Sequence, residues 1–138
     1  MNRNTKERFL VGVVGIIVKN NTVLTLKRAA GLRAQPGLWE CVSGKLEPGE
    51  QPFAAVQREI REECRLEVAV DERPLGALQH VGEQNKVIIF YRARYLSGNV
   101  CLSPEHSDYA WLSGEVFEQR CPFKGTVRHV HEALKGSG

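Results

Sequence analysis

The hydrophobic pattern at the start of the chain predicts a β-hairpin. Phe9 to Val18 contains no polar side chain and is dense in valine and isoleucine, which is typical of a strand buried on both faces of a sheet. The segment Lys19-Asn20-Asn21 that follows is a turn signal. Thr22 to Lys27 then alternates in strand fashion, so the two segments are expected to pair.

The rest of the pattern predicts further short strands and few helices. Proline is well tolerated at the first helical position, so a helix is expected to begin near Pro52 and to continue without a breaker through Phe53 to Cys64. Loops are expected at Ala29 to Leu38, at Gly44 to Gly49 and before Trp111-Leu112. The other expected elements are strands at Trp39 to Ser43, Leu66 to Val70, Leu75 to Val81 and Lys86 to Leu96, a short helix from Gly114 and a final helix from Thr126 to Lys135.

These elements indicate an α/β (α+β) domain in which two helices pack around a mixed sheet. A chain of 138 residues fits one domain, so we expect a single domain over residues 1–138 with flexible ends at 1–8 and 136–138. No apolar run approaches the roughly 20 residues that span a bilayer, so no membrane partner is expected. His129 and His131 point about 200° apart on a helix, which prevents a shared metal site and predicts surface positions.

Charge and cysteine usage narrow the partners and the compartment. The formal net charge of +3 suits a small anionic ligand but is too weak to indicate polymeric nucleic acid. The four cysteines form no CxxC pair and no zinc-like spacing, which favours free thiols in a cytoplasmic protein. The sequence leaves open whether the protein is a monomer or a homodimer.

The helix after Pro52 carries the candidate chemistry, because its side chains separate by type around the helix axis. One stripe is apolar and is expected to pack on the core; it consists of Phe53, Val56, Ile60 and Cys64. One flank of that stripe is acidic, with Glu59, Glu62 and Glu63, and the other is basic, with Arg58, Arg61 and Arg65.

The acidic flank costs helix stability unless a cation binds to it. Like charges three and four residues apart, as in Glu59–Glu62 and Glu59–Glu63, destabilise a helix by roughly 0.2–0.5 kcal/mol per pair. A divalent cation would reverse the sign of this term, and oxygen ligands alone suit Mg²⁺, with Mn²⁺ as a substitute. The alternative is a solvated charged face, on which Arg58 and Glu62 form an ordinary i,i+4 pair.

The loop before this helix completes a known spacing pattern. Five residues separate Gly44 from Glu50, and seven separate Glu50 from Arg58. The segment GKLEPGEQPFAAVQREIREECRL resembles the Nudix box, G-x5-E-x7-R-E-U-x-E-E-x-G-U, where U is aliphatic. One position departs, because Arg65 replaces a glycine that lets the helix end sharply at a positive φ. Keeping that conformation would cost about 1 kcal/mol, so we expect a reshaped helix end.

The preceding segment, LKRAAGLRAQPGLWECVSGKLE, is similar to the corresponding stretch of MutT-like members of the family. The resemblance, which covers about Val11 to Leu134, implies a Nudix-type α/β/α sandwich with a central mixed β-sheet. It also implies metal ligands, which are Glu59, Glu62, Glu63 and the backbone carbonyl of Ser43. The resemblance also implies that Glu59 orients or deprotonates the attacking water and that Arg58 orients Glu59. It further implies that Glu50 stabilises the loop by pairing with an arginine of the box.

Two further positions follow from the resemblance with alternatives. Glu105 matches the place of an additional acidic ligand or base, with Asp108 and Glu83 as competing residues. Arg28 matches a basic residue that contacts phosphate, with Lys27 and Arg33 as weaker candidates. For all of these, a solvated surface position is the alternative.

The reaction implied is magnesium-dependent hydrolysis of a phosphoanhydride bond in a nucleoside diphosphate derivative. The region Val81 to Gln84 lacks the proline and the tyrosine that mark the ADP-ribose and dinucleoside polyphosphate subfamilies. The leading substrate is therefore a nucleoside or deoxynucleoside triphosphate, cleaved to the monophosphate and pyrophosphate. ADP-ribose, a nucleotide sugar and a dinucleoside polyphosphate stay as alternatives, as does a non-catalytic nucleotide sensor on the same fold.

Overall fold

The structure is a computed structural model that describes residues 8–31 and 36–136. Its centre is the predicted hairpin of β1 (Phe9–Lys19) and β2 (Thr22–Arg28), which pair antiparallel. Asn20 and Asn21 both have positive φ, of 48° and 62°. Two consecutive residues of this kind form the tight turn whose twist matches that of the flanking strands. Asparagine tolerates this conformation, which explains why the hairpin closes here.

The remaining elements complete a mixed sheet, as predicted. They are β3 (Trp39–Glu40), β4 (Val42–Lys45), α1 (Pro52–Glu63), β5 (Glu67–Val70), β6 (Gly76–His80), β7 (Asn85–Ser97), β8 (His106–Leu112), α2 (Gly114–Arg120) and α3 (Lys124–Lys135). The strand order is β3-β2-β1-β7-β5, and β4, β6 and β8 pair with β1, β7 and β2. Only the β1–β7 pair among the described strands is parallel.

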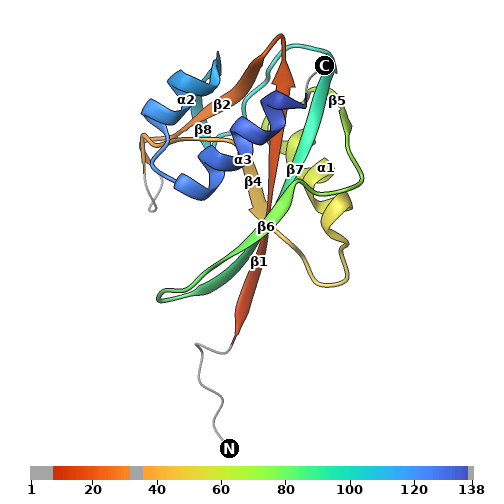
Figure 1. Cartoon of the computed structure of the whole chain (residues 1–138), viewed down its shortest axis with the longest axis vertical. Coiled ribbons are helices and arrows are strands. Elements are labelled where there is room, and N and C mark those ends of the chain that lie inside the picture. Colours follow the sequence, from red (N-terminus) through yellow and green to blue (C-terminus); the bar gives the residue numbers. More distant parts are fainter. Residues whose placement is uncertain (1–7, 32–35, 137–138) are drawn as a thin grey trace, which may run out of the picture.

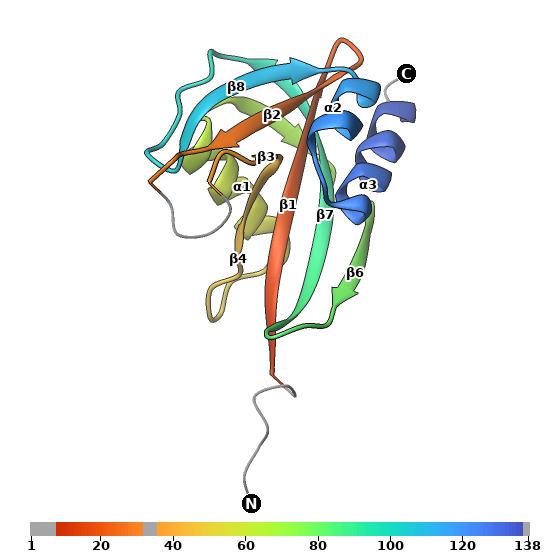
Figure 2. The ribbon, with the colours of Figure 1, turned by 90° about the vertical axis from the view of Figure 1, so that its left-hand side faces the viewer.

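Helices cover both faces of the sheet, with α1 on one side and α2 and α3 on the other (Figures 1 and 2). The alternation along β1 feeds two cores: Val13 and Ile17 pack with α1, whereas Ile16 and Val18 pack with α2 and α3. A Cβ at Gly15 would lie 3.1 Å from Val56, so this glycine lets α1 lie close to the strand. The α/β/α sandwich is therefore confirmed, with three packed helices where we expected two. No described helix is long and apolar enough to cross a membrane.

The predicted apolar stripe of α1 faces the core. Val56, Ile60 and Cys64 are fully buried, and Phe53 packs at the edge of the same core with its ring 6.1 Å from that of Tyr91. The helix begins at Pro52, as expected, and its first turn has no side-chain cap. The flanks that carry charge are therefore fixed relative to the sheet by the packing of this stripe.

Two predictions of secondary structure, one of a strand and one of a loop, need correction. The expected strand at Trp39 to Ser43 is two strands interrupted at Cys41, because β3 pairs with β2 whereas β4 pairs with β1. The expected loop before Trp111 is largely the strand β8, which pairs with β2. Ser107, Asp108 and Tyr109 are exposed, so β8 lacks the apolar alternation that signals a strand.

The two histidines of α3 have separate environments. His129 is buried, stacks on Phe90 with the ring centroids 4.0 Å apart, and has Nδ1 2.7 Å from the Gly125 carbonyl oxygen. The expected surface position is therefore wrong for His129. His131 is partly exposed and has Nε2 2.7 Å from Glu118. All four cysteines are free, and only Cys101 is exposed.

The end of α1 keeps the conformation that the box glycine would adopt. Arg65 has φ of 58°, and its N–H and that of Cys64 both donate to the Ile60 carbonyl at 3.1 Å. The expected reshaping of this helix end is wrong. The hydrogen bonds to the Ile60 carbonyl and the burial of Leu66 hold this turn in place. Arg65 therefore keeps a positive φ that is unfavourable for a residue with a side chain.

Arg65→Gly is therefore expected to raise the free energy of unfolding by about 1 kcal/mol, because glycine meets no Cβ clash at positive φ. Urea denaturation followed by circular dichroism measures the change. The control is Arg61→Gly, which places glycine inside the helix and should lower stability by about 1 kcal/mol. If both substitutions changed the free energy of unfolding in the same direction, the backbone strain assigned to Arg65 would be contradicted.

Candidate functional site

Two of the three acidic residues of α1 turn inward towards the sheet. Glu59 and Glu63 are buried, with exposed fractions of 9% and 3%, whereas the side chain of Glu62 is 57% exposed. The two inward-facing carboxyls lie close enough together for Glu59 to raise the pKa of Glu63. The expected group of three is thus a buried pair, with the third carboxylate at its solvent side.

Burial of the Glu59–Glu63 pair makes ionisation of Glu63 unfavourable. Burial raises the pKa of Glu63 far above its usual range, and the hydrogen bond to Glu59 and the negative charge of Glu59 raise it further. The Arg58 guanidinium donates to Glu59, so ionisation of Glu63 beside it would be favoured by a further cation on the Glu63 side. The hard oxygen donors of the two carboxylates fit Mg²⁺ or Mn²⁺. Within residues 8–31 and 36–136, no three acidic, histidine or cysteine side chains converge closely enough to hold a metal ion.

The strand β4 forms the other wall of this site. The Ser43 N–H donates to Glu63 Oε1 at 3.4 Å, which places the backbone of Ser43 beside the pair. A Cβ at Gly44 would overlap the carboxylate of Glu59. The glycine is thus required for space, since its φ is not in the left-handed region. The spacing between Gly44 and Glu59 in the box reflects this direct contact.

Arg58 connects the acidic groups of the loop and the helix. Its Nε and NH2 donate to the two carboxylate oxygens of Glu50 at 2.7 and 2.9 Å, a bidentate pair. Its NH1 donates to Glu59 at 2.6 Å and to Glu62 at 3.2 Å. NH2 also donates to the Lys45 carbonyl at 3.1 Å. Although Arg58 starts on the opposite flank of the helix, its guanidinium therefore fixes both the loop and the rotamer of Glu59.

This arrangement lowers the pKa of Glu50 to about 2, because the hydrogen bonds from Arg58 favour the ionised carboxylate. A pKa below the unfolded value of 4.5 contributes stability that is complete above that value and is lost as the pH falls towards 2. Glu50→Gln should therefore lower Tm at pH 7 and 5, with a difference from wild type that shrinks to nothing near pH 2. Thermal melts across this range test it. Glu47→Gln, at a largely exposed carboxylate 3.9 Å from Arg58, is the control and should change Tm little.

Glu105 is the last residue of the loop that precedes β8. Its negative charge contributes to the raised pKa of Glu63, which places the two carboxylates in electrostatic range. Its backbone carbonyl accepts from the Ala29 N–H at 2.9 Å. The competing Asp108 instead accepts from the Tyr109 N–H at 2.8 Å. Glu83, the other competitor, lies between β6 and β7, in a hairpin turn that projects away from α1 (Figure 1).

Arg28 forms part of a partly buried polar cluster that the sequence did not indicate. Its NH1 donates to Glu40 Oε2 at 3.0 Å, and the same oxygen is 2.8 Å from His106 Nε2. Glu40 is the register partner of Leu26, whose side chain belongs to the core beneath α1, so the cluster lies on the α1 face of the sheet. Lys27 alternates to the opposite face, and Arg33 lies outside the described residues. The available signal was the charged Glu40 between the apolar Trp39 and Cys41.

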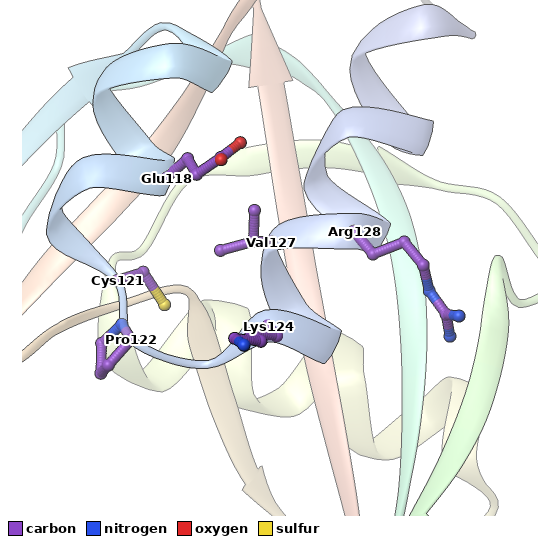
Figure 3. A pocket seen from close by; sticks show the side chains of 6 residues that line it. All are labelled: Glu118, Cys121, Pro122, Lys124, Val127 and Arg128. Atoms are coloured by element: carbon purple, nitrogen blue, oxygen red, sulfur yellow. The ribbon is translucent and has the colours of Figure 1, made fainter.

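A cavity of about 450 Å³ lies between α2 and α3 (Figure 3). It is lined by Glu118, Cys121, Pro122, Lys124, Val127 and Arg128. These helices cover the face of the sheet opposite α1 (Figure 2). The cavity is therefore separate from the carboxylate cluster, which provides the chemical groups of the site.

Comparisons with known proteins agree with this geometry. Residues 8–131 match the NUDIX domain family. A MutT-like protein of Streptomyces ambofaciens is 30% identical over 93% of this chain and 79% of its own length. The CTP pyrophosphohydrolase of Escherichia coli K12 is 31% identical over 77% of this chain and 78% of its own length.

Solved structures show the same fold. The MutT protein of Methanosarcina mazei Go1 superposes with a TM-score of 0.78 at 25% identity, covering 92% of this chain and 93% of that one. The E. coli ORF135 protein superposes with a TM-score of 0.72 at 27% identity, covering 94% and 93%. The chain belongs to the Nudix family, among MutT-like relatives, and is a hydrolase of phosphoanhydride bonds in nucleoside diphosphate derivatives.

Proposed function

We propose that this protein hydrolyses nucleoside or deoxynucleoside triphosphates to the monophosphate and pyrophosphate, with Mg²⁺ as cofactor and Mn²⁺ as a substitute. The observation that carries the proposal is the buried contact between Glu59 and Glu63 beside Ser43. Such a pair is stabilised by a divalent cation and is otherwise costly. Glu59, Glu62, Glu63 and the Ser43 carbonyl would hold this cation.

The side chains then have distinct tasks. A cation held by Glu59, Glu62, Glu63 and the Ser43 carbonyl would supply charge neutralisation of the phosphate oxygens and a water molecule of lowered pKa. Glu59 orients that water and accepts its proton, while Arg58, which donates to Glu59 at 2.6 Å, fixes the direction of the carboxylate. The oxygen of the water forms a bond to phosphorus as the bridging P–O bond breaks, and pyrophosphate leaves. No side-chain nucleophile is needed.

Two residues outside α1, Glu105 and Arg28, have roles in this proposal. Glu105 supplies an additional acidic ligand or base, supported by its electrostatic effect on Glu63. Arg28 contacts a phosphate of the substrate, supported by its place on the α1 face of the sheet. The free cysteines are consistent with a reducing, cytoplasmic location.

The substrate class is supported by relatives with similar coverage. One is named a CTP pyrophosphohydrolase, and another, from Salmonella arizonae and 30% identical over 76% of this chain, is named nucleoside triphosphatase NudI. A NAD-capped RNA hydrolase of Pseudomonas aeruginosa is 26% identical, but this chain spans only 43% of it. Triphosphates are therefore favoured over dinucleotide substrates.

A panel of nucleotides tests the proposal. Purified protein is incubated with Mg²⁺ and each of the ribo- and deoxyribonucleoside triphosphates, ADP-ribose, a nucleotide sugar and a dinucleoside tetraphosphate, and the products are separated by anion exchange. Monophosphate and pyrophosphate from a triphosphate, abolished by a chelator, are the expected result. Preferred turnover of ADP-ribose or a dinucleotide would overturn the substrate class, and binding without any turnover would indicate a sensor.

A further inference from the structure

The cluster of Arg28, Glu40 and His106 contains a feature that packing does not explain. His106 is buried, with a side-chain exposure of 1%, and its Nδ1 is the single buried side-chain nitrogen or oxygen without a hydrogen-bond partner in the described part of the chain. Leaving such an atom unpaired costs roughly 1–3 kcal/mol. A leucine here would avoid that cost, so stability alone does not account for a histidine.

The contact of the other ring nitrogen, His106 Nε2, indicates the role of this residue. Nε2 lies 2.8 Å from Glu40 Oε2, and a carboxylate oxygen accepts hydrogen bonds, so Nε2 is the donor in this contact. The same Oε2 accepts from Arg28 NH1 at 3.0 Å. One oxygen thus receives two donors, which restrict the rotamer of Glu40. Anchoring NH1 on that oxygen in turn fixes the plane of the Arg28 guanidinium.

The backbone of His106 connects the same cluster to the loop that carries Ser103 and Glu105. Its N–H donates to the Ser103 carbonyl at 3.2 Å, and the Ser103 hydroxyl accepts from the Glu105 N–H at 3.4 Å. The Glu105 carbonyl accepts from Ala29, the residue after Arg28. His106 is therefore the shared anchor of the two groups to which the proposed function gives roles at the substrate, Arg28 through its side chain and Glu105 through its backbone.

We propose that His106 is a positioning residue: acting through Glu40, it holds the Arg28 guanidinium in the orientation that receives the substrate phosphates. The inference rests on the proposed function, because it takes Arg28 to bind the triphosphate. It assigns Glu40 and His106 to substrate binding and not to the chemical step. Loss of the side-chain anchor should therefore act on KM more than on kcat.

The experiment compares His106→Leu with His106→Gln and a matched control. Leucine removes the donor to Glu40, whereas the glutamine amide places a donor near the position of Nε2. We expect His106→Leu to raise KM for the preferred triphosphate about tenfold with kcat changed less than about threefold, and His106→Gln to recover most of the loss. His129→Leu is the control, because His129 is equally buried but on the opposite face of the sheet. Its KM should stay at the wild-type value.

Two further measurements separate positioning from loss of fold. The KM effects of His106→Leu and Glu40→Gln should be strongly non-additive in the double variant, because both break one chain of contacts. Binding of the non-hydrolysable α,β-methylene analogues of CTP and GTP, measured by calorimetry, should weaken about tenfold in His106→Leu. Equal losses in His106→Leu and His129→Leu, or additive effects, would overturn the inference. If the wild-type protein hydrolyses no nucleotide, the proposed function is wrong. The positioning role is tested independently of turnover by analogue binding, and binding by His106→Leu equal to that of wild type would overturn it.

Discussion

Glu59→Gln is expected to lower kcat about 10³-fold, because the proposed function assigns to Glu59 both a charge that would hold the cation and the acceptance of a proton from the attacking water. The substitution keeps the shape of a side chain that is buried against Gly44 and Glu63. The glutamine amide can donate to Glu63, so the metal-free protein should remain folded. Steady-state kinetics with the preferred triphosphate and Mg²⁺ measure the loss.

Thermal melts supply a second readout for this variant. Wild type should gain Tm on addition of Mg²⁺ or Mn²⁺, because a ligand that binds only the folded state stabilises it, and Glu59→Gln should lose most of this gain. Glu67→Gln, an exposed carboxylate just beyond the helix, is the control and should keep both turnover and the metal response. A Glu59→Gln enzyme with near wild-type kcat would remove Glu59 from the mechanism.

Gly44→Ala is expected to lower kcat/KM about 10²-fold, because the new methyl group would occupy the space of the Glu59 carboxylate and force it aside. Displacement by about 1 Å at a reacting group is enough for an effect of this size. The strand itself should survive, since Gly44 pairs with Val13 in a regular antiparallel ladder. Kinetics and a far-ultraviolet circular dichroism spectrum together test this.

The neighbouring glycine on β1 is the matched control for this substitution. A Cβ at Gly12 would lie 3.4 Å from the Gly44 carbonyl oxygen, an ordinary contact, so Gly12→Ala should retain activity within a fewfold. Both variants add one methyl group to the β1–β4 pair. Similar losses in both would attribute the effect of Gly44→Ala to sheet distortion instead of displacement of Glu59.

Much of the architecture could be read from local pattern. The unbroken apolar run of β1, the Asn20-Asn21 turn and the stripe on α1 each express a periodicity set by neighbouring residues in the chain. The prediction failed at β8, whose polar edge carries no such periodicity, and at Arg65, where tertiary packing keeps a positive φ despite an unfavourable side chain. It also failed at His129, because the stacking partner Phe90 comes from a distant strand.

By itself the sequence determined the spacing that brings Glu59, Glu62 and Glu63 to one flank of a helix, because helical geometry alone relates residues three and four apart. Only the tertiary structure decided that Glu59 and Glu63 are buried together while Glu62 faces solvent, since burial depends on where β4 lies. It likewise decided that Glu40 meets His106, 66 residues away in the chain. Contacts between distant segments arise from strand pairing and core packing, which no local pattern specifies.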